Sequence, residues 1–347
     1  MEKKSKKRLV WQLPFLLLLI IGTVIIIKQQ RVAPYIHNTG FVFGTVYHIT
    51  YQYDDDLQPE IEAELKKVDN SLSMFNKRST ISKFNNGCSI NMSNDNMFDE
   101  VYSLAYRVSG ATNGAFDITV APLVNAWGFG FKNGKMPGKH QVDSIMTFIG
   151  FNKIKESKVN GKDIITKSDK RMMLDCSAIA KGYGSDVVAR FLRSKGIKNF
   201  MIELGGEIVT NGVSDKRIPW KIGVTKPSDD SLNVKQEIQT ILNVTDMAMA
   251  TSGNYRNFYY KGGKKYAHTI DPKTGYPVQH NILSSTVLAK NCATADAFAT
   301  SFMVLGLDGS KKILEKHPEL MAYFIYSDNK GNMQVWYSPN LKKRINA

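Results

Sequence analysis

The feature that most constrains this chain is an uninterrupted apolar segment close to its N-terminus. Residues 10–27, VWQLPFLLLLIIGTVIII, carry no charge; the basic stretch EKKSKKR precedes them, and Lys28 and Arg31 follow. Eighteen such residues suffice for a helix that spans a bilayer, and the basic flank predicts a cytoplasmic start with the rest of the chain on the opposite side. A cleaved signal peptide is the alternative, but no small-residue cleavage site directly follows the apolar core. We therefore expect an uncleaved membrane anchor.

The 316 residues after Arg31 have the composition of a globular protein. They hold +9 of the chain's net charge of +15, which suits a small polyanionic ligand or an anionic membrane surface and equally serves solubility. Nucleic acid is not an expected partner in that compartment. The three cysteines, Cys88, Cys176 and Cys292, are odd in number and widely spaced, so they predict neither a disulfide framework nor a zinc site.

Strand-like and helix-like patterns follow one another irregularly, which predicts the α+β class rather than a regular βαβ repeat. Alternating apolar residues predict strands, and apolar residues three and four apart predict helices. Gly196 is a helix stop. The expected strands are 43–53, 117–120, 199–204, 220–225, 239–245 and 284–289, and the expected helices are 58–75, 94–111, 186–195 and 295–305.

The stretch TADAFATSF, residues 294–302, places an acid within a run of small and apolar side chains. In a helix, Asp296 and Thr300 lie on one face because they are four residues apart. A carboxylate and a hydroxyl on one face suit Mg²⁺, which binds oxygen ligands and keeps water or substrate phosphate at its other positions. The alternative is that Asp296 caps the apolar helix that follows it. The stretch alone leaves both open.

Three further stretches carry more polar or glycine residues than simple turns need. Asp117 stands among apolar residues, and a buried acid requires partners. Residues 175–186, DCSAIAKGYGSD, place Asp175 and Lys181 at a predicted helix start, where backbone N–H groups favour phosphate, although the P-loop pattern is absent. The stretch ELGGEI, residues 203–208, allows close approach of a ligand or is a tight turn.

Residues 249–277, MATSGNYRNFYYKGGKKYAHTIDPKTGYP, combine an arginine, a histidine and an acid before proline. Singly, His268 is more often a structural residue than a base, and DPKTG is an ordinary turn signature. Together, Arg256, His268 and Asp271 predict a proton acceptor beside an anion-binding group.

Seven stretches, in this order, resemble the signatures of the ApbE-type FAD:protein FMN transferases, and the resemblance covers about residues 41–340. The stretches are GTVYHITY, GAFDITVAPLVNAWGFG, DCSAIAKGYGSD, ELGGEI, ATSGNYRNFY, HTIDPKTGYP and ADAFATSFMVLG.

The resemblance implies a single large, T-fold-like catalytic domain over residues 41–340. The basic flank and anchor then occupy residues 1–31, a linker occupies residues 32–40, and a short tail occupies residues 341–347. The resemblance also implies a Mg²⁺-dependent enzyme with FAD as substrate. Such an enzyme attaches FMN through a phosphoester to a threonine or serine of an acceptor protein and releases AMP. The implied acceptor motif is D-x-x-[ST]-G-A-[ST]. The implied acceptors are subunits of Rnf and Na⁺-pumping quinone reductase (Nqr) complexes, and the implied place is the periplasmic side of a bacterial inner membrane.

Residue by residue, the resemblance assigns metal ligands and flavin contacts. Metal binding falls on the carbonyl of Ala178 and the side chains of Asp296 and Thr300. His268 is our candidate base, oriented by Asp271, with Arg256 as the anion-binding group. The implied flavin contacts are Phe43, Phe75, Ala115, Phe116, Asp117, Asp175, Lys181 and Ile270.

The chain departs from the family pattern at a few positions. Phe43 replaces a frequent methionine, and Phe75 replaces a tyrosine found in some members. Ala299 replaces a second aspartate found in others, and this loss of a carboxylate predicts a weaker or more hydrated metal site. SGAT at 109–112 resembles the end of an acceptor motif, but Tyr106 stands where it needs aspartate, so self-modification is not expected. An FAD pyrophosphatase and a non-catalytic flavin-binding protein are the alternative functions.

Overall fold

A computed structural model describes residues 13–23, 32–130, 136–227, 237–254, 258–261, 264–279 and 281–346. Residues 13–23 are helical and lie inside the expected anchor segment; the remainder of that segment falls outside the described residues. Within the described ranges, no helix combines the length and the apolar character that crossing a membrane requires.

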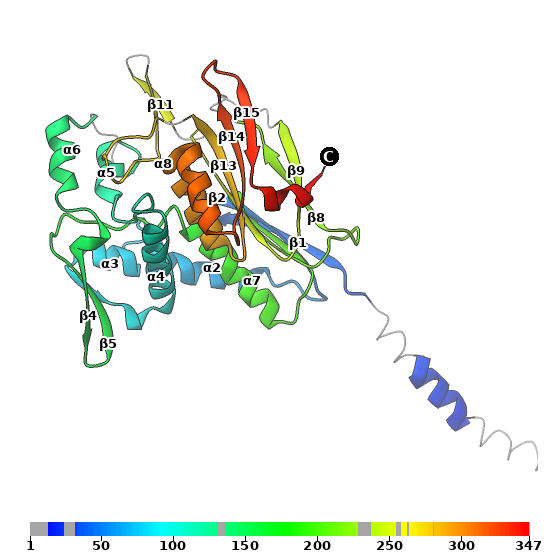
Figure 1. Ribbon diagram of the computed structural model, residues 1–347. Coiled ribbons are helices and arrows are strands. Elements are labelled where there is room, and N and C mark those ends of the chain that lie inside the picture. Colours follow the sequence, from blue (N-terminus) through cyan, green and yellow to red (C-terminus); the bar gives the residue numbers. More distant parts are fainter. Residues whose placement is uncertain are drawn as a thin grey trace, which may run out of the picture.

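The domain is built on an eight-stranded sheet in which every neighbouring pair is antiparallel (Figure 1). Its order is β1-β2-β6-β7-β10-β13-β14-β15. The strands are β1 (Tyr35–Val42), β2 (Thr45–Gln52), β6 (Phe200–Leu204), β7 (Glu207–Asn211), β10 (Ala248–Gly253), β13 (Ile282–Ala289), β14 (Met321–Ser327) and β15 (Met333–Tyr337).

Helices cover one face of this sheet (Figure 1). They include α2 (Gln58–Leu72), α4 (Asn96–Ala111), α7 (Ala180–Ser194) and α8 (Cys292–Lys316). Successive side chains of a strand point to opposite faces. Ala250 and Val287 accordingly pack in the core beneath the helices, and Met249 and Leu288 pack against the other face.

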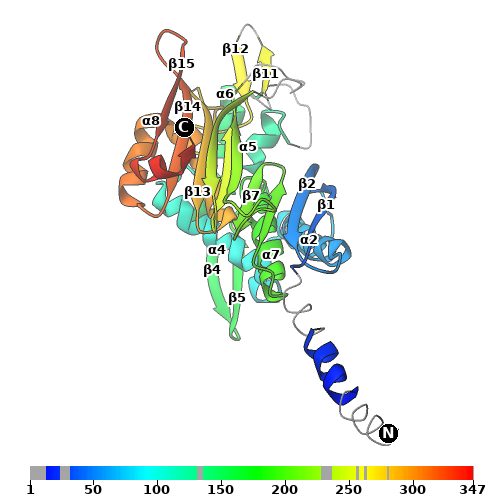
Figure 2. The same ribbon diagram turned by 90° about the vertical axis from the view of Figure 1, so that its right-hand side faces the viewer.

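A three-stranded sheet of order β16-β9-β8 covers that second face (Figure 2). Its strands are β8 (Trp220–Thr225), β9 (Ile238–Val244) and β16 (Ile345–Asn346), and the 3-10 helix η3 (Pro339–Arg344) lies beside them. Buried Leu242 of β9, Leu341 of η3 and Ile325 of β14 share one apolar cluster. The three layers therefore bury both faces of the middle strands.

Smaller elements surround the helical layer. They are α3 (Thr80–Asn86), β3 (Ser89–Asn91), η1 (Met92–Asn94), α5 (Ala121–Ala126), α6 (Lys139–Met146), η2 (Phe151–Lys153), β4 (Ile154–Val159), β5 (Lys162–Lys167), β11 (Phe258–Lys261) and β12 (Lys264–Ala267). The short helices α5 and α6 pack around Trp127 and Leu123 in a cluster that includes Ile270, so this group supports the 268–277 segment.

The mixed α+β class is confirmed, but the expected elements account for only part of the structure. Of the expected elements, α7 begins at Ala180 and not at residue 186, and two others differ as follows. Residues 117–120 form a turn instead of a strand, with a single parallel bridge between Val120 and Met173; Pro122, which lacks an N–H, begins α5 there. The last helix extends over Cys292–Lys316, although Gly306 adopts a non-helical φ of 69° and breaks it.

The N-terminal ends of α7 and α8 approach each other very closely. A Cβ added at Gly182 would lie 2.5 Å from the carbonyl oxygen of Cys292. A Cβ at Gly184, two residues further into α7, would lie 2.8 Å from the ring of Phe43. Glycine at these two positions lets α8 pack on one side of α7 and the β1–β2 turn on the other.

We expect Gly182→Ala to destabilise the protein, because its new methyl group meets backbone of α8 that cannot move freely. Overpacking of this kind costs about 1–3 kcal/mol, which urea unfolding would measure. Gly110→Ala in α4 is the matched control, since no atom lies within 4 Å of its Cβ position; its stability should stay equal or rise by about 0.5–1 kcal/mol. Equal stability of the two variants would contradict the proposed contact.

Candidate active site

A pocket of about 480 Å³ opens between the β1–β2 turn, the loop after α2 and the start of α7. It brings together four of the predicted flavin contacts, which come from distant parts of the sequence. These are Phe43, Phe75, Asp175 and Lys181. Phe43 has a left-handed backbone with φ of 52°, and Phe75 is 75% exposed at the rim. Two aromatic rings at the pocket provide surface against which a planar ring can stack.

The segment that carries Asp175 is fixed from both sides. The Asn85 side chain accepts a hydrogen bond from Leu174 N (2.7 Å) and donates one to Leu174 O (2.9 Å). Asp175 N donates to Ile118 O (2.7 Å), and the Asp175 carboxylate accepts from Ser177 N (2.7 Å). Burial raises the pKa of Asp175, and the Ser177 hydrogen bonds partly oppose that rise. This acid is therefore held rigidly in the pocket wall.

The two helices that meet at the site cap each other. Asp296 of α8 accepts a hydrogen bond from Gly182 N in the first turn of α7 (3.1 Å). Asp186 of α7 accepts from Cys292 N and Ala293 N at the start of α8 (2.8 Å each). The N-cap of α8 itself is Asn291. The alternative that Asp296 caps its own helix is therefore wrong, because Asp296 lies inside α8 and its carboxylate bonds to α7.

A buried acid that the sequence analysis did not single out completes this group. Glu207 begins β7, with its side chain 3% exposed, and forms an ion pair with Lys181, which is 30% exposed. Lys181, Glu207 and Asp296 together carry a net charge of −1 when all three are ionised. Burial, reinforced by Asp296, raises the pKa of Glu207 to about 7 despite the opposing charge of Lys181. The stretch ELGGEI stands out in the sequence for its two glycines, which allow close approach of a ligand or form a tight turn, and not for its second acid.

Thr300 lies one turn after Asp296 on α8, as the spacing predicted. Its hydroxyl is hydrogen-bonded to that of Ser252 on β10 (3.0 Å). Burial raises the pKa of Asp296, which Lys181 and Gly182 N–H oppose, so a further cation beside it would be favourable. No group of three or more His, Cys, Asp or Glu side chains suited to a metal occurs among the described residues. The predicted set, Asp296, Thr300 and the Ala178 carbonyl, consists of oxygen donors, which fits Mg²⁺.

The predicted base lies in the segment 268–277, which β10 holds in place. The Thr269 hydroxyl donates to the Asn254 side chain at the end of β10 (2.8 Å). The ring of His268 lies 6.4 Å from that of Phe129, edge to face. Both carboxylate oxygens of Asp271 accept hydrogen bonds within their own turn, from Lys273 N and the Thr274 hydroxyl. Arg256 lies outside the described residues.

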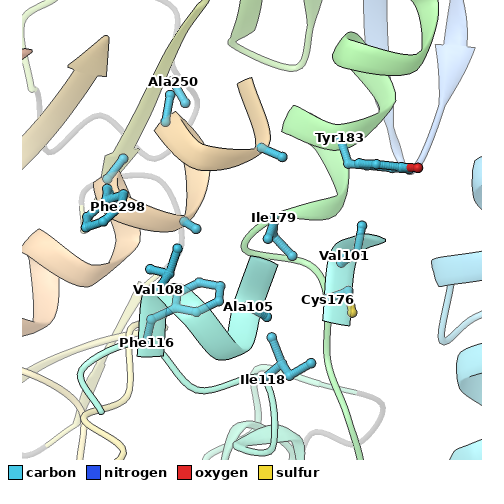
Figure 3. Close-up of a cluster of buried hydrophobic side chains, with 14 of the residues drawn as sticks. Val101, Ala105, Val108, Phe116, Ile118, Cys176, Ile179, Tyr183, Ala250 and Phe298 are labelled. Carbon is cyan, nitrogen blue, oxygen red and sulfur yellow. The ribbon is translucent and has the colours of Figure 1, made fainter. Parts of the chain in front are cut away.

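The remaining predicted flavin contacts do not line the described pocket. Ala115 is buried against Val278 and Val304, and Ile270 is buried in the α5–α6 cluster. Phe116 lies beside Val108 of α4 (Figure 3). Burial raises the pKa of Asp117, whose carboxylate accepts from Thr119 N (2.8 Å).

Comparison with known proteins gives consistent matches. A family model described as the ApbE family matches residues 43–324. A Haemophilus influenzae protein named FAD:protein FMN transferase is 36% identical over 313 residues, which cover 86% of this chain and 89% of that protein. The structure of a flavin transferase ApbE from Vibrio cholerae is similar with a TM-score of 0.79 and 34% identity, covering 90% of this chain and 99% of that one. That of the Pseudomonas stutzeri flavinyl transferase ApbE, in its apo form, has a TM-score of 0.79 and 27% identity, covering 92% and 99%.

The mutual capping predicts a pH-dependent stability. Burial raises the pKa of Asp186 to about 6 from an ordinary value of 3.8, so the folded protein takes up a proton on this acid before the unfolded chain does. Protonation of Asp186 therefore stabilises the folded protein fully below about pH 4, and this stabilisation is lost as the pH rises through 6. Asp186→Asn lacks this titration, so its stability deficit against the wild type should widen by roughly 1–3 kcal/mol between pH 7 and pH 4.

Urea unfolding at a series of pH values measures this difference. Asp169→Asn is a control of opposite sign, because hydrogen bonds from Arg171 lower the pKa of the half-buried Asp169 to about 2. The Asp169→Asn difference from the wild type should stay constant between pH 7 and about pH 4 and shrink as the pH falls from there to about 2. A constant Asp186→Asn deficit across the range would contradict the raised pKa.

Proposed function

The chain belongs to the ApbE family and is a transferase, and from that premise we propose that it cleaves FAD and transfers FMN to a hydroxyl of an acceptor protein. The observation that carries this proposal is the pocket that joins Phe43 and Phe75 to Asp175 and Lys181 at the start of α7. Aromatic side chains there offer stacking surface for the flavin. The Lys181 ammonium and the α7 N-terminus offer positive charge to the pyrophosphate.

Mg²⁺ is the metal that the site's donors suit. Asp296, Thr300 and the Ala178 carbonyl would hold it in the proposed enzyme. When bound, Mg²⁺ would supply positive charge to the phosphate oxygens as the pyrophosphate is cleaved. The hydrogen bond from Gly182 N and the Ser252–Thr300 hydroxyl pair hold the two side-chain ligands in place, so little reorganisation is needed on binding.

The transfer step exchanges one phosphorus–oxygen bond for another. The acceptor hydroxyl oxygen attacks the FMN phosphorus, and the bond to the bridging oxygen breaks, so that AMP leaves with that oxygen. His268 accepts the hydroxyl proton as general base. Asp271, whose carboxylate closes its own turn, supports the backbone that carries His268. Arg256 is proposed to bind phosphate charge.

We infer that residues 10–27 anchor the enzyme in a bacterial inner membrane, with the catalytic domain on the periplasmic side. Supporting this, the described helical residues of the segment expose their large apolar side chains to between 46% and 67%. The basic flank supports the orientation. We propose acceptors with the motif D-x-x-[ST]-G-A-[ST] in Rnf- or Nqr-type membrane complexes, which an anchored enzyme would meet on the same surface.

Incubation of residues 32–347 with FAD, Mg²⁺ and an acceptor domain that carries D-x-x-T-G-A-T should increase the acceptor's intact mass by one FMN phosphoester. The increase should disappear with EDTA, and Asp296→Ala should reduce its rate by about a hundredfold or more, as loss of transition-state charge stabilisation does, while FAD still binds. Release of free FMN and AMP with several unmodified acceptors would favour an FAD pyrophosphatase. FAD binding without any cleavage would favour a non-catalytic flavin-binding protein.

His268→Ala should lower the transfer rate by about 10²–10⁴-fold, the usual contribution of a general base. Single-turnover intact-mass measurements would report this rate directly. FAD affinity should change little, because the base acts on the acceptor hydroxyl. A variant that retains nearly the full rate would assign the base to another group.

A further inference from the structure

The short helix α3 touches two walls of the pocket from behind. Its residues, Thr80–Asn86, contribute no side chain to the lining of the described pocket. Ile81 and Phe84 are buried in the main core cluster, which fixes one side of the helix. The polar side chains of α3 and of its N-cap bond instead to backbone that carries pocket residues, and the mechanism above does not use them.

The start of α3 holds the rim loop, residues 73–75, which lines the pocket and carries Phe75. The N-cap residue Ser79 donates its hydroxyl to Ser73 O (2.7 Å). Ser82, in the first turn, donates to Met74 O (3.2 Å). Both serines are buried, where a hydrogen bond is stronger than in water. The rim loop is therefore tied to α3 directly before its exposed aromatic ring.

The end of α3 holds the acid segment, residues 172–175, which carries Asp175 into the pocket wall. The Asn85 side chain forms the two hydrogen bonds to Leu174 N and O described above. The Lys167 ammonium donates to Asn85 O and to Met172 O (2.8 Å each), and Lys167 is buried. The backbone that leads into Asp175 is therefore bonded to the last turn of the same helix.

These contacts make α3 a strut of fixed length between the rim loop and the acid segment. Ser82 and Asn85 lie on one face of the helix because they are three residues apart, and the helix sets their spacing at 1.5 Å of rise per residue. Hydrogen bonds tolerate only small changes in length. The separation of Phe75 from Asp175 then follows from the helix and not from the loops on either side.

We propose that Asn85 is a positioning residue for the flavin, which acts through α3 by setting the separation of the rim loop from the acid segment. This inference rests on the proposed function, since it concerns the flavin of that same site. A planar ring gains stacking energy only when the aromatic surface lies at a defined distance, and a preformed wall spares the cost of ordering it on binding. Asn85 thereby increases affinity for the flavin half of FAD and not for the pyrophosphate, which Lys181 and the α7 N-terminus meet.

The test compares Asn85→Ala with Asn86→Ala. Asn86 is the matched control, because it is the same residue type in the same last turn and its side chain donates to Ser82 O within α3 (2.9 Å). Flavin fluorescence anisotropy in Mg²⁺, without acceptor, gives the affinity for FAD. Displacement of FAD by ADP gives the affinity for ADP, which has the pyrophosphate but lacks the flavin.

For Asn85→Ala we expect FAD to bind about tenfold more weakly, which corresponds to the loss of one aromatic stacking contact. Its ADP affinity should stay within about twofold of the wild type. The absorption spectrum of the bound flavin should move towards that of free FAD, because the ring stacks less well. Asn86→Ala should change neither affinity. Equal losses for FAD and ADP, or unchanged FAD binding by folded Asn85→Ala, would overturn the proposal.

Ser82→Ala releases the other end of the strut and tests the proposal even if Asn85→Ala does not fold. It should weaken FAD binding by about threefold, because Ser79 still holds Ser73 O, and it should leave ADP binding unchanged. The double variant should bind FAD no more weakly than Asn85→Ala alone, since a strut released at one end no longer sets the separation. Additive losses would indicate two independent contacts and would also overturn the proposal.

A failure of the proposed function gives a different result. Wild-type protein that binds FAD but modifies no acceptor would overturn only the proposed function, since the affinity measurements need no acceptor. Wild-type protein that binds ADP as tightly as FAD, and still modifies the acceptor, would overturn only the role of Asn85, because the flavin would then add nothing to affinity.

Discussion

The mutual capping of α7 and α8 is the interaction on which the site depends. Asp296 satisfies a backbone N–H of α7, and Asp186 satisfies two of α8. Gly182 permits the contact because any side chain there would meet the Cys292 carbonyl. Unpaired N–H groups at a buried helix start are costly, so each helix needs the other at this distance. The contact that stabilises the core thereby also places the Asp296 carboxylate beside Lys181.

The elements with strong local signals could be predicted from the sequence. Periodicity identified α2, α4 and the strands β2, β6, β8, β9 and β13, and Gly196, with φ of 78°, marks the stop after α7. Residues 117–120 were misjudged because Val120 pairs with Met173 through a single isolated bridge and not through a strand ladder. The strand order could not be derived, because neighbours such as β2 and β6 are separated by more than a hundred residues and pair through tertiary contacts alone.

The site was predictable in part. The spacing of Asp296 and Thr300 identified one helix face, and the resemblance identified Phe43, Phe75, Asp175 and Lys181, which do share a pocket. Spacing could not identify the Gly182 N–H as the partner of Asp296, because the two lie 114 residues apart. Glu207 was missed for a similar reason. Its partner, Lys181, lies on another element, whereas its own neighbours in the sequence predict either close approach of a ligand or a glycine turn.

The strand β1 also sets how far the pocket lies from the segment that precedes the domain. Its eight residues, Tyr35–Val42, rise by about 3.3 Å each, or roughly 25 Å in total, and end at the turn that carries Phe43. Pairing with β2 along its whole length makes this distance rigid. With the proposed anchor before Tyr35, β1 would be a rigid spacer between the start of the domain and the pocket. An acceptor would then have to reach a pocket set back from the anchored end, so geometry as well as sequence motif would select which membrane proteins are modified.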